Sequence, residues 1–119
     1  SEYYALDDED LPETAFPLSY ELLGKEQSKD KRILAEVKKT KSLYQIKPFT
    51  GGGKTRDLIC YKEKIVVPKS LQSRIIQWYH DYLGHPGINR TEETIGQHLW
   101  WPKMRNQITN SVTSCDSCQ

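Results

Sequence analysis

The chain has 119 residues, which is room for one small domain or two very small ones. Hydrophobic residues make up 36% of it, and no apolar run reaches the roughly 18 residues that a membrane-spanning helix needs, so we expect no membrane contact. The chain does not begin with the charged and then apolar residues of a secretory signal peptide. It has three cysteines, which is an odd number. Both features favour an intracellular, reducing compartment over a secreted disulfide framework.

The net charge of +1 hides an uneven distribution. Residues 1–13 hold six acidic and no basic residues, so residues 14–119 hold 17 basic and 10 acidic ones. This surplus favours an acidic partner such as nucleic acid only weakly, because a solvated lysine-rich surface explains charge alone better. We expect residues 1–18, which include Pro12 and Pro17, to form an irregular acidic tail or linker.

Residues 19–68 are expected to form a small extension domain that begins with two helices. Ser19 can cap a short first helix, which Gly24 weakens. Ser28 or Asp30 can cap the second, which places apolar residues on one face and lysines on the other.

The period of the pattern then changes from helical to extended. Residues 43–46 and 58–61 are typical of two antiparallel strands, and residues 65–67 of a third strand that Pro68 ends. The glycine-rich stretch at 51–55 between the first two is a hairpin turn. It is not a phosphate-binding loop, because Phe49 stands where that loop needs its first glycine.

Residues 69–119 are expected to form a bundle of three short helices. Ser70 can cap the first helix, which ends at His80. The second starts at Gly87 or Asn89 and continues through His98 and Leu99. Pro102 suits the first turn of the third. The apolar stripes of the three helices, together with two tryptophans, form the expected core: Leu71, Ile75, Ile76, Tyr79, Ile88, Thr91, Ile95, Leu99, Trp100, Trp101, Met104, Ile108 and Val112.

Four residues of this bundle form a complete ligand set for zinc. His80 and His85 are spaced His-x4-His, and after 29 further residues Cys115 and Cys118 form Cys-x2-Cys. Two imidazoles and two thiolates match the tetrahedral Cys2His2 set of structural zinc sites. Histidines five residues apart do not share a helix face, so Gly84 must end the helix between them.

Other interpretations of the same residues are weaker. A Cys-x2-Cys pair alone could be two buried thiols, a redox pair or a chance match, but the two histidines in this order make a single structural zinc ion the better interpretation. His98 and Cys60 are left over, and for both we expect a structural role. A zinc-dependent hydrolase is disfavoured, because four protein ligands leave no open coordination position.

The bundle contains the motifs Tyr79-His80-Asp81, Gly84-His85-Pro86-Gly87-Ile88, Arg90-Thr91, Trp100-Trp101-Pro102-Lys103-Met104 and Ser114-Cys115-Asp116-Ser117-Cys118-Gln119. On these motifs, residues 69–119 resemble the HHCC zinc-binding N-terminal domain of retroelement integrases, most closely those of Gypsy-type long-terminal-repeat retrotransposons. Residues 26–30, the hairpin and residues 66–68 are more loosely similar to the N-terminal extension domain that precedes it in such polyproteins.

This resemblance implies an α+β chain in which a helix-turn-helix-like zinc bundle follows the extension domain. It implies that His80, His85, Cys115 and Cys118 hold the zinc. The implied partners are other integrase subunits in a homo-oligomer and the DNA ends of the element, with no small-molecule substrate. The implied location is the nucleus or a cytoplasmic virus-like particle. Arg90, Lys103 and Arg105 lie on polar helix faces and could reach phosphates, although surface solvation explains each of them better.

The catalytic core of the family, with its acidic metal-binding triad, should follow Cys118, but the chain stops at Gln119. We therefore expect a fragment or a domesticated remnant that has no catalytic residues and performs no strand transfer. The alternative to a DNA-end-binding module is a domesticated zinc module that contacts proteins and does not bind DNA. The mere +1 balance of residues 69–119 favours that alternative.

Removal of the metal should unfold residues 69–119. Metal binding is coupled to folding in such domains and contributes roughly 10–16 kcal/mol in zinc-finger peptides. We expect a chelator titration to abolish the helical circular dichroism of the bundle and to shift the tryptophan emission. Unchanged signals at saturating chelator would contradict a structural role for the metal.

Overall fold

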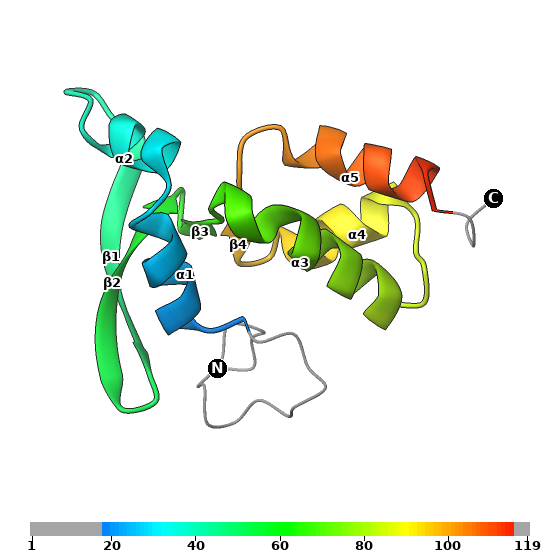
Figure 1. The fold of residues 1–119 in the computed structure, drawn as a ribbon, viewed down its shortest axis with the longest axis horizontal. Coiled ribbons are helices and arrows are strands. Elements are labelled where there is room, and N and C mark those ends of the chain that lie inside the picture. Colours follow the sequence, from blue (N-terminus) through cyan, green and yellow to red (C-terminus); the bar gives the residue numbers. More distant parts are fainter. Residues whose placement is uncertain (1–17, 116–119) are drawn as a thin grey trace.

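The computed structural model describes residues 18–115. Most of the expected tail (residues 1–17) and residues 116–119, which include Cys118, lie outside this range. The fold is α+β, as expected (Figure 1). Within the described range no helix is long and apolar enough to cross a bilayer. The elements are α1 (Tyr20–Gln27), α2 (Lys31–Val37), β1 (Tyr44–Gly51), β2 (Lys54–Tyr61), β3 (Lys64–Val66), α3 (Lys69–Tyr82), α4 (Ile88–Ile95), β4 (Leu99–Trp100) and α5 (Met104–Thr113).

The first two helices begin at the expected caps. The Ser19 hydroxyl accepts a hydrogen bond from the Leu22 amide at 3.1 Å. Of the two candidates for α2, it is Asp30 whose carboxylate accepts from the amides of Arg32 and Ile33. Gly24 does not end α1. A Cβ at this position would lie 3.2 Å from the Leu58 side chain, so the glycine lets α1 pack closely on β2.

The hairpin is longer than expected, because both of its strands run on to the turn. β1 and β2 pair antiparallel, with Tyr44 opposite Tyr61 and Gly51 opposite Lys54. Gly52 and Gly53 both have positive φ, which fits the two-residue turns that match the twist of a hairpin. Pro48 lies within β1. An edge strand tolerates proline, since the missing N–H can face solvent.

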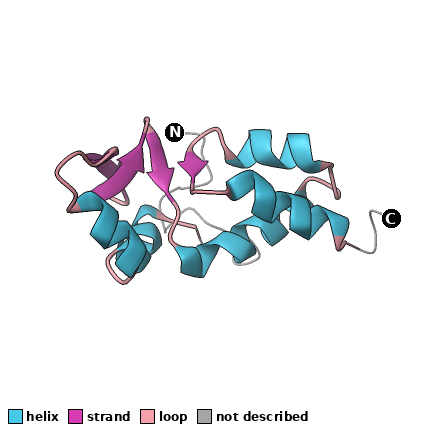
Figure 2. Ribbon diagram, turned by 90° about the horizontal axis from the view of Figure 1, so that it is seen from above, coloured by secondary structure: helices cyan, strands magenta, loops and turns pink. Residues whose placement is uncertain are grey.

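The main departure from expectation lies between residues 96 and 100. Helix α4 ends at Ile95 instead of continuing through His98 and Leu99, and residues 99–100 form β4. This strand pairs parallel with β3, placing Leu99 opposite Ile65 and Trp100 opposite Val66. The pairing satisfies backbone groups along the free edge of β3, which a longer α4 would leave open. Because β4 lies between α4 and α5, the pairing also extends the sheet to the helical bundle (Figure 2).

One hydrophobic core serves both halves of the described chain. It includes Leu23 and Leu58 of the extension together with Ile75, Leu99 and Trp101 of the bundle. Trp101 is buried as expected. Trp100 is not fully buried and instead stacks on Tyr61, with ring centroids 4.0 Å apart. The expected boundary at residue 68 stays a prediction, but core and sheet both continue across it.

Two expected helix starts are wrong. Pro68, not Ser70, occupies the cap position of α3, and the Ser70 hydroxyl instead donates to the Glu26 carboxylate at 2.6 Å. Pro102 is not in the first turn of α5, because Lys103 adopts a left-handed backbone (φ 63°) that delays the helix to Met104. Tertiary contacts and backbone conformation override the local capping preference at both sites.

Gln27 fills a gap where β3 separates from β2. Its side-chain amide donates to the carbonyls of Ile59 (3.0 Å) and Val66 (2.8 Å), and its carbonyl accepts from the Ile59 amide at 2.9 Å. The residue is 3% exposed. The Gln27 side chain therefore replaces strand-to-strand hydrogen bonds between β2 and the end of β3.

Substitution Gln27→Leu should destabilise the protein by about 2–4 kcal/mol, because it leaves buried backbone groups of Ile59 and Val66 without partners. Urea unfolding followed by circular dichroism measures this change. The matched control is Gln77→Leu, at an exposed position of α3, which should change stability by less than about 0.5 kcal/mol. Equal losses in the two variants would contradict the role given to Gln27.

Candidate metal centre

The turn after α3 brings two histidines together. Gly84 has φ 80° and ends the helix, as expected. The His85 amide donates to the His80 carbonyl at 2.8 Å, and the Gly84 amide donates to the Asp81 carbonyl at 3.2 Å. These two bonds form a Schellman motif. Helix α3 extends two residues past the expected end, to Tyr82, so His80 lies in its last turn.

The backbone of His85 turns its ring back toward His80. His85 has φ 60°, a left-handed conformation that histidine adopts more readily than most residues. The two imidazole rings lie 4.7 Å apart between centroids and are nearly perpendicular. The sequence Gly84-His85 thus reverses the chain tightly enough for both rings to face one point.

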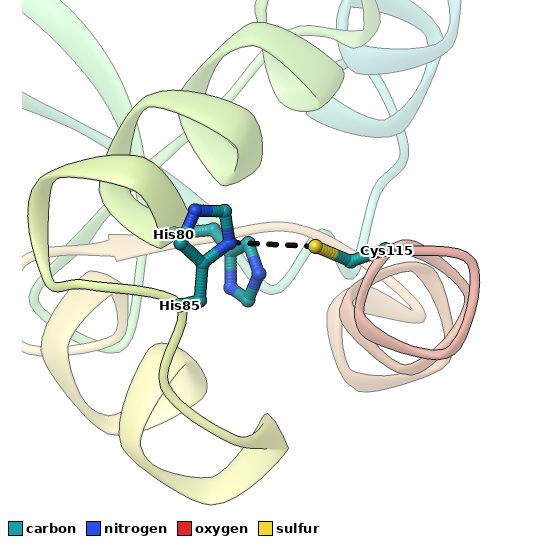
Figure 3. Close-up of side chains that lie close together, drawn as sticks. All are labelled: His80, His85 and Cys115. Atoms are coloured by element: carbon teal, nitrogen blue, oxygen red, sulfur yellow. Dashed lines mark hydrogen bonds between the residues drawn. The ribbon is translucent and has the colours of Figure 1, made fainter. Parts of the chain in front are cut away.

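Cys115 joins this pair from the far end of α5. Its amide donates to the Val112 carbonyl at 3.1 Å, which continues the last turn of the helix. Its Sγ lies 3.3 Å from His85 Nδ1 (Figure 3). One ligand atom from each of His80, His85 and Cys115 lies within 4.8 Å of the others. The cluster therefore joins the end of α3 to the end of α5.

These donors fit a zinc ion. Zinc bonds of about 2.0–2.3 Å in a tetrahedron separate neighbouring ligand atoms by roughly 3.3–3.8 Å. The contact between Cys115 and His85 has this length, and the upper bound on the other separations is about 1 Å longer than this range. A small closure of the cluster would bring all three atoms to bonding distance.

The surroundings of His80 favour the neutral form of its imidazole. Its side chain is buried, whereas His85 is exposed. Burial lowers the pKa of His80, the nearby His85 lowers it further, and Asp81 opposes the shift. A lowered pKa favours the neutral imidazole, which is the form that binds metals.

Asp81 has a supporting position that the sequence analysis did not assign. Its carboxylate lies 3.8 Å from His85 Nε2, on the opposite side of the ring from Cys115. Carboxylates that contact the outer nitrogen of a metal-binding histidine orient the ring and raise its basicity. The signal in the sequence is an acidic residue four positions before the histidine.

The structure thus brings three of the four expected ligands together. The complete set with Cys118 stays a prediction, because that residue lies outside the described range. Cys60 is fully buried in β2, where burial raises the pKa of its thiol to about 11. His98 contributes its backbone carbonyl to the Ile65 amide, and burial is the main cause of its lowered pKa. Neither residue belongs to the metal cluster found in the described range, which is made of His80, His85 and Cys115.

The three candidate phosphate contacts are not part of the metal cluster, and each has different surroundings. Arg105 pairs with Glu92 and donates to the Asn89 side chain at 2.9 Å. Lys103 precedes α5, and Arg90 is exposed on α4. A role for any of the three in DNA binding stays a prediction.

Substitution His85→Gln should lower the zinc affinity by at least about 100-fold, because it removes a ligand from the cluster. Competition with a colorimetric zinc chelator measures the affinity. The matched control is His98→Gln, which should bind zinc as the parent protein does. An unchanged affinity for the His85 variant would exclude this residue as a ligand.

The expected family is also found by comparison with known proteins. Residues 67–119 match the family model of the integrase zinc binding domain. The match starts directly after β3, spans α3, α4, β4 and α5, and includes the His80-His85-Cys115 cluster. It covers less than half of the chain and does not include the extension. Zinc is the metal that this match implies for the centre, and residues 67–119 match an integrase zinc-binding domain of the HHCC type.

Proposed function

We propose that this chain is the N-terminal module of a Gypsy-type retrotransposon integrase that binds the DNA ends of the element and supports multimerisation. The observation that carries the proposal is the integrase zinc-binding domain, in which the metal cluster joins the ends of α3 and α5. The working location would be the nucleus or a virus-like particle.

The zinc-binding domain is non-catalytic, and its metal serves the fold. With Cys118 as the fourth ligand, the ion would have no open position for substrate or water. Phosphoryl transfer by two metal ions needs clustered carboxylates. Within residues 18–115, the group of side chains able to hold a metal contains histidines and a cysteine instead. Strand transfer would therefore be the task of another part of the parent integrase.

The distribution of charge supports a role for the extension in DNA binding. Residues 19–68 hold 12 basic and six acidic residues, whereas residues 69–119 hold five basic and four acidic ones. Basic residues attract the phosphate backbone irrespective of sequence. The zinc bundle would then organise the module, and the extension would add basic residues that attract DNA.

A protein-contact function is the second candidate, and one surface feature favours it. Tyr82 is 71% exposed and stacks on Trp78, with ring centroids 4.9 Å apart. Exposed aromatic residues are enriched at protein interfaces. In a domesticated protein this pair could bind a protein partner without any DNA, and in an integrase it could contribute to multimerisation.

The salt dependence of duplex binding separates the two candidates. We expect the zinc-loaded chain to bind a labelled duplex whose sequence is that of an element end, with an affinity that falls steeply as salt rises, because each phosphate contact releases counterions. Fluorescence anisotropy at several salt concentrations measures the slope. Absent or salt-independent binding, together with self-association in sedimentation, would favour the protein-contact function.

A further inference from the structure

Two adjoining hollows lie where the extension meets the zinc bundle. The larger has a volume of about 610 Å³ and is walled by residues of α2, of the first turn of α3 and of α5, with Val66 and Val67 between them. The smaller, of about 420 Å³, lies around the start of α2 and α3. Both are lined by Asp30, Arg32 and Lys69, so they form one continuous surface, which we call the junction groove.

Basic residues from three separate helices or their caps line the junction groove. Arg32 comes from α2, Lys69 from the start of α3 and Lys103 from the cap of α5. Lys29 and Lys31 line the smaller hollow. Among residues 18–115, no acidic side chain forms an ion pair with Lys31, Arg32, Lys69 or Lys103.

The acidic residues of the groove already have partners. Asp30 accepts hydrogen bonds from the amides of Arg32 and Ile33 through one oxygen and from the Lys69 amide through the other. Glu26 accepts from the Ser70 hydroxyl and lies 3.5 Å from Lys29. Glu36 pairs with Lys39 at 2.9 Å. Five basic residues (Lys29, Lys31, Arg32, Lys69 and Lys103) line the groove against three acidic ones (Glu26, Asp30 and Glu36), so the groove presents a net positive surface.

Neutral hydrogen-bonding groups complete the wall formed by α5. Asn106 and Asn110 are exposed on this helix, one turn apart, and line the larger hollow with Lys103. Amide and basic side chains are the groups that contact phosphate and sugar in protein–DNA complexes. The combination is typical of a surface that holds a nucleic-acid backbone without reading its bases.

The face of α4 lacks this character. A hollow there is lined by Glu92 and Glu93, with Lys64 as its one basic residue. Arg105, which the sequence suggested as a phosphate contact, is held by Glu92 and Asn89 beside it. A polyanion is therefore attracted to the junction groove more than to α4.

We propose that the junction groove binds the phosphodiester backbone of duplex DNA. This inference rests on the proposed function and locates the contact. Arg32, Lys69 and Lys103 would contact phosphates, while Asn106 and Asn110 would contact phosphate or sugar. The groove exists only where α2 lies beside the bundle, so neither half of the chain alone would carry the site.

The test compares two double variants of the full, zinc-loaded chain. Arg32→Gln with Lys69→Gln removes two groove charges, and Lys41→Gln with Lys54→Gln removes two exposed charges outside the groove. In duplex-binding titrations, we expect the groove variant to bind at least about tenfold more weakly at low salt. The slope of log affinity against log salt should become shallower by about 1.8, which is two contacts at about 0.9 each. The control should bind within about threefold of the parent protein.

A second measurement does not depend on substitution. DNA should protect Lys69 and Lys103 from chemical acetylation and leave Lys41 and Lys54 reactive. Thermal unfolding and zinc content establish that both variants are folded. Equal weakening of the two variants, or no protection of Lys69 and Lys103, would overturn the groove while leaving DNA binding intact. If the parent chain shows no salt-dependent binding at all, the proposed function itself fails.

Discussion

The pairing of β3 with β4 is the constraint on which the rest of the molecule depends. The amides of Ile65 and Val67 donate to the carbonyls of His98 and Trp100, each at 2.9 Å. These bonds close a segment that contains α3 and α4, and they hold the bundle against the sheet of the extension. The metal cluster restrains the opposite end, where α3 and α5 finish. The bundle is thus held at one end by backbone pairing and at the other, where α3 and α5 finish, by the metal ligands.

The features predicted correctly from the sequence are local ones. The caps at Ser19 and Asp30 and the helix break at Gly84 depend on a few neighbouring residues. The predictions were wrong where contacts with segments distant in sequence determine the secondary structure. Leu99 continues the apolar period of α4, but backbone groups of β3 are available beside it, and strand pairing prevails.

The metal cluster could be predicted from the sequence, whereas the junction groove could not. Ligand type and spacing predicted the cluster of His80, His85 and Cys115, because few other uses require those residues in that order. The junction groove could not be predicted, since Arg32, Lys69 and Lys103 are far apart in sequence and meet only through the fold. The sequence also gave no sign that Glu92 would hold Arg105.

The edge strand β1 has a consequence for how copies of this chain can associate. An open edge offers backbone groups to any other strand, and Ile46, which is 59% exposed, adds an apolar contact there. Pro48 has no N–H to donate, so a strand laid along the middle of β1 would lose a hydrogen bond. Extension of the sheet by a further strand along this edge is thereby disfavoured.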